Sequence, residues 1–322
     1  MKLNVATSPH IKSTDSVFKI MTDVILALVP ALIAAVYFFG VRALLLAVLG
    51  IVGGETIEIF IMRYIRGVRD FKPDGSAAVT GLLLAMNVNV GLPLWVFITG
   101  LIAALVLGKH VYGGLGKNPF NPALVGRVFL LVSFPSYMTT WWAPKYWKLE
   151  ALTTATPLGL LKEGGASAVN FSYSQLFLGN VGGCLGEVST LALIIGFLYL
   201  VFRKRIKILI PISYLGVVLI LSSIFWMVNP ERFGDPLLHL LSGGLMLGAL
   251  FMATDMVTTP MTPKGHLIFG AGCGVITMVI RYFAGYPEGV SFSILIMNSL
   301  TPLIDIYTRP KVFGEDMGVR GR

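Results

Sequence analysis

Apolar windows, several of them long enough for a membrane-spanning helix, recur along almost the whole chain. A bilayer core about 30 Å thick needs about 20 mostly apolar residues per spanning helix. The first set of windows covers 17–39, 41–62, 77–90, 94–107 and 125–138, and the second covers 187–202, 206–228, 237–253, 267–283 and 290–307. The pattern predicts an all-α polytopic membrane protein with about ten transmembrane helices.

The composition agrees with a chain whose main solvent is lipid. Hydrophobic residues make up 55% of the sequence and charged residues only 13%, whereas a soluble globular domain carries about 25% charged residues. The net charge is +9, but the basic residues lie in short clusters between apolar windows, so we expect no nucleic-acid partner. Cys184 and Cys273 are too few for a four-cysteine cluster, and we expect no metal site.

The basic clusters also predict an orientation. Short cytoplasmic loops of membrane proteins collect Lys and Arg. If the N-terminus is cytoplasmic, the cluster Arg203 to Lys207 and the basic residues near both chain ends face the cytoplasm, while the connections on the other side hold fewer cations. We therefore expect both termini in the cytoplasm and the long polar insertion on the opposite side of the membrane.

The polar insertion divides the windows into two sets of five. We expect a first five-helix repeat at 1–138, an extracytoplasmic loop at 139–186 and a second five-helix repeat at 187–322. Because five is odd, the second repeat enters the membrane from the opposite face, so the repeats are inverted. Interrupted segments at equivalent places in inverted repeats indicate a buried binding site, although such interruptions also occur as plain packing kinks.

Both halves carry such interruptions, and charged residues lie beside them. Asp74-Gly-Ser-Ala77 leads the third window, and Thr254 to Pro260 follows its counterpart in the second half. The fifth windows carry the similar segments Asn118-Pro-Phe-Asn-Pro122 and Asn298-Ser-Leu-Thr-Pro302. Ionisable groups within a membrane are functional candidates, and the candidates in this sequence are Glu55, Glu58, Arg127, Asp255 and Asp305. For each carboxylate, ion or cofactor handling and interhelical structure both stay open.

The segment Leu152-Thr-Thr-Ala-Thr-Pro-Leu158 lies in the insertion and is the first candidate for chemistry. A residue before proline is pushed to an extended conformation. The hydroxyl of Thr156 is therefore expected to stand clear of any helix and to be reachable. Thr-rich segments before a proline are also ordinary turns, and the heptapeptide alone leaves both interpretations open.

Several sequence blocks, in order, resemble the RnfD/NqrB family of respiratory membrane subunits. The blocks are Ser8 to Ser13, Asp74 to Gly81, Gly113 to Pro122, Phe251 to Asp255 and Met297 to Asp305. In this family a Ser/Thr-Gly-Ala-Thr type motif carries FMN on its last threonine, which corresponds to Thr156, while Thr154 stands where the family often has Gly. The length is similar to that of RnfD, since NqrB proteins carry a longer N-terminal region.

The resemblance implies flavin sites, beside which the candidates from the sequence itself are placed. FMN would be attached to Thr156 through a phosphodiester by a dedicated flavin transferase, and a second, non-covalent riboflavin-like group is possible by analogy with NqrB. Gly182, Gly183, Gly186 and Glu187 lie at the start of the sixth window, where free backbone N–H groups at a helix N-terminus would meet the flavin phosphate. The glycines are equally consistent with a flexible linker. The residues expected at a second-flavin or core site are Asn118, Asn121, Arg127 and Asp255, and those on an ion pathway are Glu55, Glu58 and Asp305.

The function implied by the resemblance is electron transfer within a ferredoxin:NAD+ oxidoreductase of the Rnf type, coupled to Na+ or H+ translocation. Such a subunit would lie in a prokaryotic cytoplasmic (inner) membrane. Its partners would include a second FMN-bearing subunit and iron–sulfur subunits. Two alternatives are an NqrB-like subunit of a quinone reductase and a non-redox channel or secondary transporter, because inverted repeats suit a transporter equally well.

Overall fold

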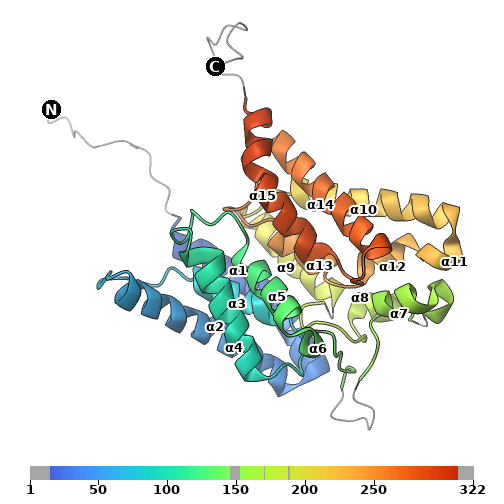
Figure 1. Ribbon diagram of the computed structural model, residues 1–322, viewed down its shortest axis with the longest axis horizontal. Helices are drawn as coiled ribbons and strands as arrows, with labels where there is room; N and C mark the ends of the chain where they lie inside the picture. The colour runs from blue at the N-terminus through green and yellow to red at the C-terminus, as the bar shows by residue number, and fades with distance from the viewer. Residues whose placement is uncertain (1–14, 146–152, 170, 188, 311–322) are drawn as a thin grey trace, which may run out of the picture.

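The chain folds into helices arranged in two neighbouring groups. The structure is a computed structural model of the 322-residue chain, and it describes residues 15–145, 153–169, 171–187 and 189–310. Within these ranges it contains no β-strand, and the only β-type pairing is a single bridge between Trp142 and Thr153. Helices α1 to α6 form one group, and α9 to α15 form most of the other (Figure 1). The predicted all-helical class is confirmed.

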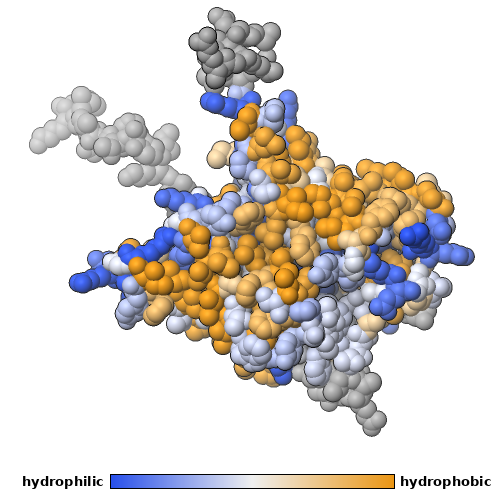
Figure 2. All heavy atoms as spheres, viewed as in Figure 1, coloured by the Kyte–Doolittle hydropathy of each residue, from blue (hydrophilic) through white to orange (hydrophobic). Residues whose placement is uncertain are grey.

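Among the residues that the structure describes, five helices are long and apolar enough to cross a membrane. They are α1 (Val17–Phe39), α2 (Val41–Phe60) with the π-helical turn Ile61–Ile65, α10 (Leu209–Val228), α14 (Pro263–Phe283) and α15 (Val290–Thr308). Large apolar side chains point outward from several helices: Ile33 is 64% exposed and Phe202 is 82% exposed. Figure 2 shows apolar residues covering much of the visible helical surface. Such a surface is stable when it faces lipid.

The other predicted windows fall on shorter or bent helices. Four shorter apolar helices are α3 (Ser76–Met86), α4 (Leu94–Leu105) with the π-helical turn Val106–His110, α5 (Pro122–Ser133) and α9 (Thr190–Phe202). The window 237–253 coincides with a helix pair, Pro230–Leu241 and Leu245–Met252, bent by 46°. Counting that pair as one span gives six candidate crossings in the described residues. A multi-pass membrane protein is confirmed, and about ten crossings in inverted repeats stays a prediction.

Small residues allow neighbouring helices to approach closely, both within a group and between the two groups. A Cβ atom at Gly50 of α2 or at Gly81 of α3 would meet the backbone carbonyl of the other glycine. A Cβ at Gly196 of α9 would likewise meet the carbonyl of Ala27 in α1. Lipid provides little hydrophobic drive for helix association, so close packing of small residues replaces it.

The glycine-rich stretch that follows α8 (Tyr173–Leu178) enters the bundle as a loop. The Leu185 N–H donates to the Val88 carbonyl at 3.0 Å, and the Gly186 N–H donates to the Met86 carbonyl at 2.7 Å. The predicted sixth window began at Glu187, but α9 starts only at Thr190 and is capped by Ser189. The reason is that this loop satisfies the free carbonyls at the end of α3 instead of continuing into a helix.

Candidate functional site

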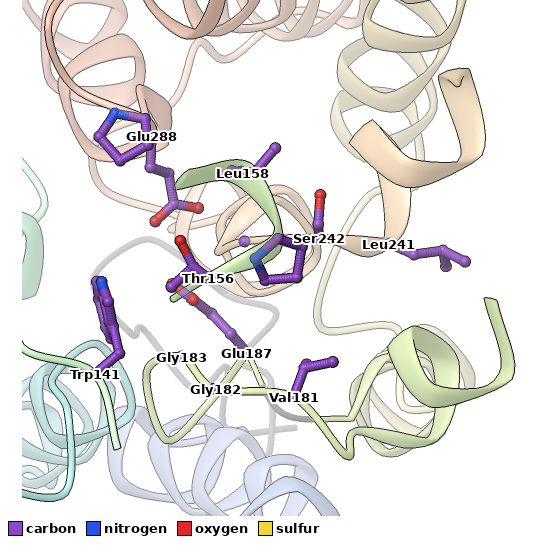
Figure 3. Close-up of a pocket in the computed structure, with 13 residues that line it drawn as sticks. Trp141, Thr156, Leu158, Val181, Gly182, Gly183, Glu187, Leu241, Ser242 and Glu288 are labelled. Atoms are coloured by element: carbon purple, nitrogen blue, oxygen red, sulfur yellow. The ribbon is translucent and has the colours of Figure 1, made fainter. Parts of the chain in front are cut away.

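Thr156 is the N-cap residue of the short helix α7 (Pro157–Gly164). Its backbone is extended, with φ −77° and ψ 153°, as the following proline requires. Its hydroxyl oxygen accepts a hydrogen bond from the Gly159 N–H at 3.1 Å, and the side chain is partly exposed. In Figure 3 this oxygen points toward the carboxylate of Glu288. The hydroxyl is therefore reachable at a helix N-terminus, where the helix dipole favours a negative group.

The threonine segment before α7 is fixed on two sides. Thr153 forms the β-bridge with Trp142, and the Thr154 N–H donates to the Trp141 carbonyl at 3.0 Å. On the other side lies Gly182, where an added Cβ would collide with the Thr154 side chain. Gly182 is thus required for close approach of the glycine loop to the threonine segment.

A cavity of about 520 Å³ opens beside Thr156. Its lining includes Arg127, Leu131, Met138, Thr139, Trp141, Thr153, Thr154, Ala155, Thr156, Gly159, Glu163, Tyr286, Pro287, Glu288, Ser291 and Phe292. Pockets for small molecules and cofactors typically have volumes of about 300–1,000 Å³ and a largely apolar lining with a few polar groups. Its aromatic residues, two charged carboxylates and one guanidinium fit a cofactor-sized aromatic ligand.

A narrower pocket adjoins this cavity and shares Thr156 with it (Figure 3). Gly182, Gly183 and Glu187 line it, together with residues from the bend between α12 (Pro236–Leu241) and α13 (Leu245–Leu247). Three of the four residues expected near the flavin phosphate are therefore brought to Thr156. The fourth, Gly186, packs against Met86 instead and lines neither pocket.

A buried charge cluster forms the wall of the cavity. Arg127 of α5 donates through Nη2 to the Glu288 carboxylate at 2.8 Å and through Nη1 to Asn87 Oδ1 at 2.9 Å. The same Nη2 lies 3.5 Å from Oε1 of Glu187. Glu288 also accepts a hydrogen bond from the Gly244 N–H. One guanidinium thus faces two carboxylates, and the cluster joins both halves of the chain.

The two carboxylates of the cluster have opposite protonation preferences. Burial, together with the negative charge of Glu288, raises the pKa of Glu187 to about 8. Burial also acts on Glu288, but the positive charges of Arg127 and Arg281 outweigh it and hold the pKa of Glu288 below its usual value. Oε1 of Glu187 accepts no hydrogen bond within the described residues. Glu187 is therefore the member of the cluster that takes up a proton.

The residues predicted for a second-flavin or core site lie in two different places in the structure. Asn118, Asn121 and Asp255 line a separate cavity of about 100 Å³, but Arg127 lines the Thr156 cavity. Asn121 caps the start of α5, and Arg127 lies six residues further on, roughly 9 Å along the helix axis. The structure therefore does not bring Arg127 together with the other three residues.

The small cavity lies between the starts of α1, α3 and α5 and the segment after the bent pair. Its lining includes Ile20, Met21, Val24, Ser76, Val79, Thr80, Leu83, Lys109, Leu115, Asn118, Asn121, Pro122, Leu200, Arg205, Ile206, Phe251, Thr254, Asp255, Met256 and Val257. Asn121 donates to the Met252 carbonyl at 3.2 Å, and Asp255 accepts from Thr258 at 3.2 Å. The small cavity therefore lies at the start of α5, and the Thr156 cavity lies further along the same helix.

The predicted ion-pathway residues lie in two places. Glu58 forms a buried ion pair with Lys109, which also donates to the Ser76 hydroxyl at 2.6 Å. Glu55, one turn earlier on α2, accepts from the Ala78 N–H at 3.2 Å. Asp305 of α15 instead accepts from the Met261 N–H at 2.9 Å. The structure brings Glu55 and Glu58 to the start of α3 and leaves Asp305 at the loop before α14.

Sequence reasoning missed two residues of these sites. Lys109 is only 2% exposed, and its place directly after an apolar window was the available signal. Glu288 lies in a short polar segment between two apolar windows, and no feature of that segment distinguishes it from an exposed glutamate. The two cysteines are free and buried.

The fold and the site define a helical multi-pass membrane protein with a loop threonine at the edge of a cofactor-sized cavity. The chain belongs to the NQR2, RnfD, RnfE family, whose model matches residues 4–314. The family prediction is therefore confirmed, although its first block, Ser8 to Ser13, lies outside the described residues.

Similar curated proteins cover nearly the whole chain. One, from Clostridium ljungdahlii, is the D subunit of a proton-translocating ferredoxin:NAD(+) oxidoreductase complex, 45% identical over 96% of this chain and 96% of its own. Another, from Acetobacterium woodii, is the D subunit of a Na(+)-translocating ferredoxin:NAD(+) oxidoreductase complex, 44% identical over 98% of this chain and 96% of its own. The D subunit of an ion-translocating oxidoreductase complex from Cronobacter sakazakii is 36% identical over 98% of this chain and 99% of its own.

Proposed function

We propose that this chain is the D subunit of an ion-translocating ferredoxin:NAD+ oxidoreductase complex of the Rnf type. It carries electrons through a flavin while the complex moves Na+ or H+ across a prokaryotic cytoplasmic membrane. The support is the similarity to the two ferredoxin:NAD(+) oxidoreductase subunits over nearly the full length of each chain. Its partners are the other subunits of the complex, including a second FMN-bearing subunit and iron–sulfur subunits.

The flavin proposed for this subunit is FMN, joined to Thr156 by a phosphodiester. The observation that carries this proposal is the position of the Thr156 hydroxyl, at the N-terminus of α7 and on the wall of the 520 Å³ cavity. FMN accepts and releases electrons through its ring, and the protein supplies placement, electrostatics and exclusion of water. The flavin transferase is needed only for attachment.

The residues of the cavity have separate roles in this proposal. Trp141, Tyr286 and Phe292 offer aromatic faces to a flat ring and exclude water from it. Arg127, held by Glu288 at 2.8 Å, supplies a fixed positive charge beside that ring. Glu187 holds or releases a proton at Oε1, which accepts no hydrogen bond within the described residues. The cluster therefore sets the electrostatic surroundings of the cofactor.

A second, non-covalent flavin of the riboflavin type is proposed for the smaller cavity. Asn118, Asn121 and Asp255 supply hydrogen-bonding groups there, and Phe251 supplies an aromatic face. The cavity measures about 100 Å³, below the usual volume of a cofactor site. Binding therefore requires the lining side chains to move apart. The proposed ion-handling carboxylates are Glu55 and Glu58, near the start of α3, and Asp305 of α15 in the second half of the chain.

The proposed topology is ten membrane crossings in two inverted repeats, with both termini cytoplasmic. The helix packing supports it, because α4 packs on α5 as α14 packs on α15, and α1 packs on α9, its counterpart in the second half. Labelling of intact cells tests the orientation. A membrane-impermeant maleimide should label Glu163→Cys but not Lys204→Cys, and the reverse pattern would reject the topology. Both native cysteines are buried.

Absorbance of the denatured, purified chain tests the flavin proposal. The chain is expressed with its flavin transferase, and covalent FMN should keep it yellow, with absorbance near about 450 nm. Thr156→Ala should be colourless and Thr153→Ala, the matched control, should stay yellow. A colourless wild type, despite an active transferase, would instead favour the channel or transporter alternative.

A further inference from the structure

Another polar cavity, of about 270 Å³, lies at the ends of two long helices and shares Leu158 and Pro287 with the narrower pocket at Thr156. It is formed where α7 meets α11 (Pro230–Phe233), α12 and the end of α14. Its lining includes Leu158, Leu161, Lys162, Gly165, Arg232, Phe233, His239, Arg281, Tyr282, Phe283, Ala284 and Pro287. Three of these residues are cationic and none is acidic, so the cavity has the electrostatics of an anion site.

Arg281 supplies the buried charge of this cavity. It is 5% exposed, and its two terminal nitrogens donate to the carbonyls of His239 at 2.7 Å and Ser242 at 3.2 Å. Its Nε is buried and has no hydrogen-bond partner within the described residues. No carboxylate of those residues lies within ion-pair distance of it, because Glu288 pairs with Arg127 instead. A buried guanidinium with an unused donor favours binding of an anion.

The other two cations are exposed at the rim of the cavity. Lys162, in the last turn of α7, donates to the carbonyls of Ala284 and Tyr286. The guanidinium of Arg232 lies 5.3 Å from the centre of the Phe233 ring. Neither cation forms an ion pair within the described residues, and the neighbouring acidic residues of the sequence do not line the cavity. Both cations are therefore available to an incoming anion.

The cavity lies at the level where the chain leaves the membrane. Helix α10 ends at Val228 and α14 ends at Phe283, and these two residues are 75% and 64% exposed. The rings of Phe225, Phe233 and Tyr282 pack together beneath the rim, with centroids about 5 Å apart. Figure 2 shows hydrophilic residues gathered where α7 and α11 lie, next to the apolar surface of α10 and α14. Such surroundings suit a ligand with an anionic head and an apolar tail.

We propose that this cavity binds the phosphate headgroup of an anionic phospholipid. The phosphate would accept hydrogen bonds from Lys162, Arg232 and Arg281, while the acyl chains would lie along the lipid-facing side of α14. The inference needs no flavin and stands apart from the proposed function. It has a consequence for the cofactor site, because α7 carries Lys162 in its last turn and Thr156 at its N-cap. A bound lipid would hold α7 against α11 and α14.

Lipid binding to the delipidated chain in a neutral detergent tests the proposal. Native mass spectrometry and thermal unfolding are measured with added phosphatidylglycerol, phosphatidylcholine or inorganic phosphate. Phosphatidylglycerol should bind and raise the unfolding temperature, and the other two should not. One charge-assisted hydrogen bond is worth about 1.5–3 kcal/mol, so Lys162→Gln or Arg232→Gln should each weaken phosphatidylglycerol binding about tenfold or more. Both side chains are exposed, so the variants should fold.

The matched control is Arg63→Gln, because Arg63 is an exposed cation in the π-helical turn after α2, outside the cavity. It should bind phosphatidylglycerol as the wild type does. Equal binding of the two lipids, or unchanged binding in both cavity variants, would overturn the proposal. Binding of inorganic phosphate with no preference for phosphatidylglycerol would show a free-anion site and would also overturn it.

Discussion

Replacing Arg127 by Met should destabilise the protein strongly, because the change leaves two carboxylates buried without their cation. Arg127 contacts Glu288 at 2.8 Å and Asn87 at 2.9 Å, and it is 8% exposed. Removing one partner of a buried ion pair costs about 3–5 kcal/mol. The unfolding entropy is about 2.1 cal/mol/K per residue, so for 322 residues each kcal/mol lowers the unfolding temperature by about 1.5 °C, and the expected fall is at least about 4 °C.

A double-mutant cycle separates the ion pair from simple loss of packing. Glu288→Gln removes the charge that Arg127→Met leaves unpaired, so the double variant should be less destabilised than the sum of the two single variants. Thermal unfolding in detergent at one fixed pH measures all three. Arg63→Met, at an exposed position, is the control and should change stability by no more than about 0.5 kcal/mol. Additive single effects, or an unchanged Arg127→Met, would refute the reasoning.

Three further variants test other parts of the account. The pKa of Glu187 is about 8 in the folded protein, against a usual value of 4.5. Protonated Glu187 therefore adds to the free energy of unfolding fully below pH 4.5, and this contribution is lost as the pH rises to 8. Glu187→Gln should remove that part of the pH dependence of thermal unfolding. Gly182→Ala should displace the threonine segment and lower covalent flavin content, whereas Gly285→Ala, in open space, should not. Lys109→Met should lower the free energy of unfolding by about 3–5 kcal/mol, because it leaves Glu58 buried without its cation. The double variant Lys109→Met with Glu58→Leu should lose less. Equal losses of the two variants in thermal unfolding would reject the buried ion pair.

The apolar pattern of the sequence predicted the helices well, because burial in lipid needs long apolar runs. Windows such as 17–39 and 267–283 agree with α1 and α14 to within a few residues. The same pattern could not say that α3 stops at Met86. That end depends on Leu185 and Gly186, about a hundred residues later, which donate to backbone carbonyls at the end of α3. Contacts between distant segments leave no mark on local hydropathy.

The sequence predicted the accessible threonine of the candidate site, but it did not predict the charged residues around it. The proline after Thr156 already indicated an extended, accessible hydroxyl, and the structure places that residue at the N-cap of α7. The separation of Arg127 from Asn121 also follows from helix geometry, since six residues on one helix span roughly 9 Å. By contrast, Glu288 reaches Arg127 only because α15 packs near α5. Its neighbours in the sequence carry no sign of that contact.

The central claim is that Thr156 carries FMN, and peptide mass spectrometry tests it most directly. The chain is purified from cells that contain its flavin transferase and is then digested. The peptide containing Thr156 should be heavier by about 438 Da, the mass of FMN less one water, and fragmentation should place that mass on Thr156. An unmodified Thr156 under these conditions, or the same added mass on Thr153 or Thr154, would contradict the account.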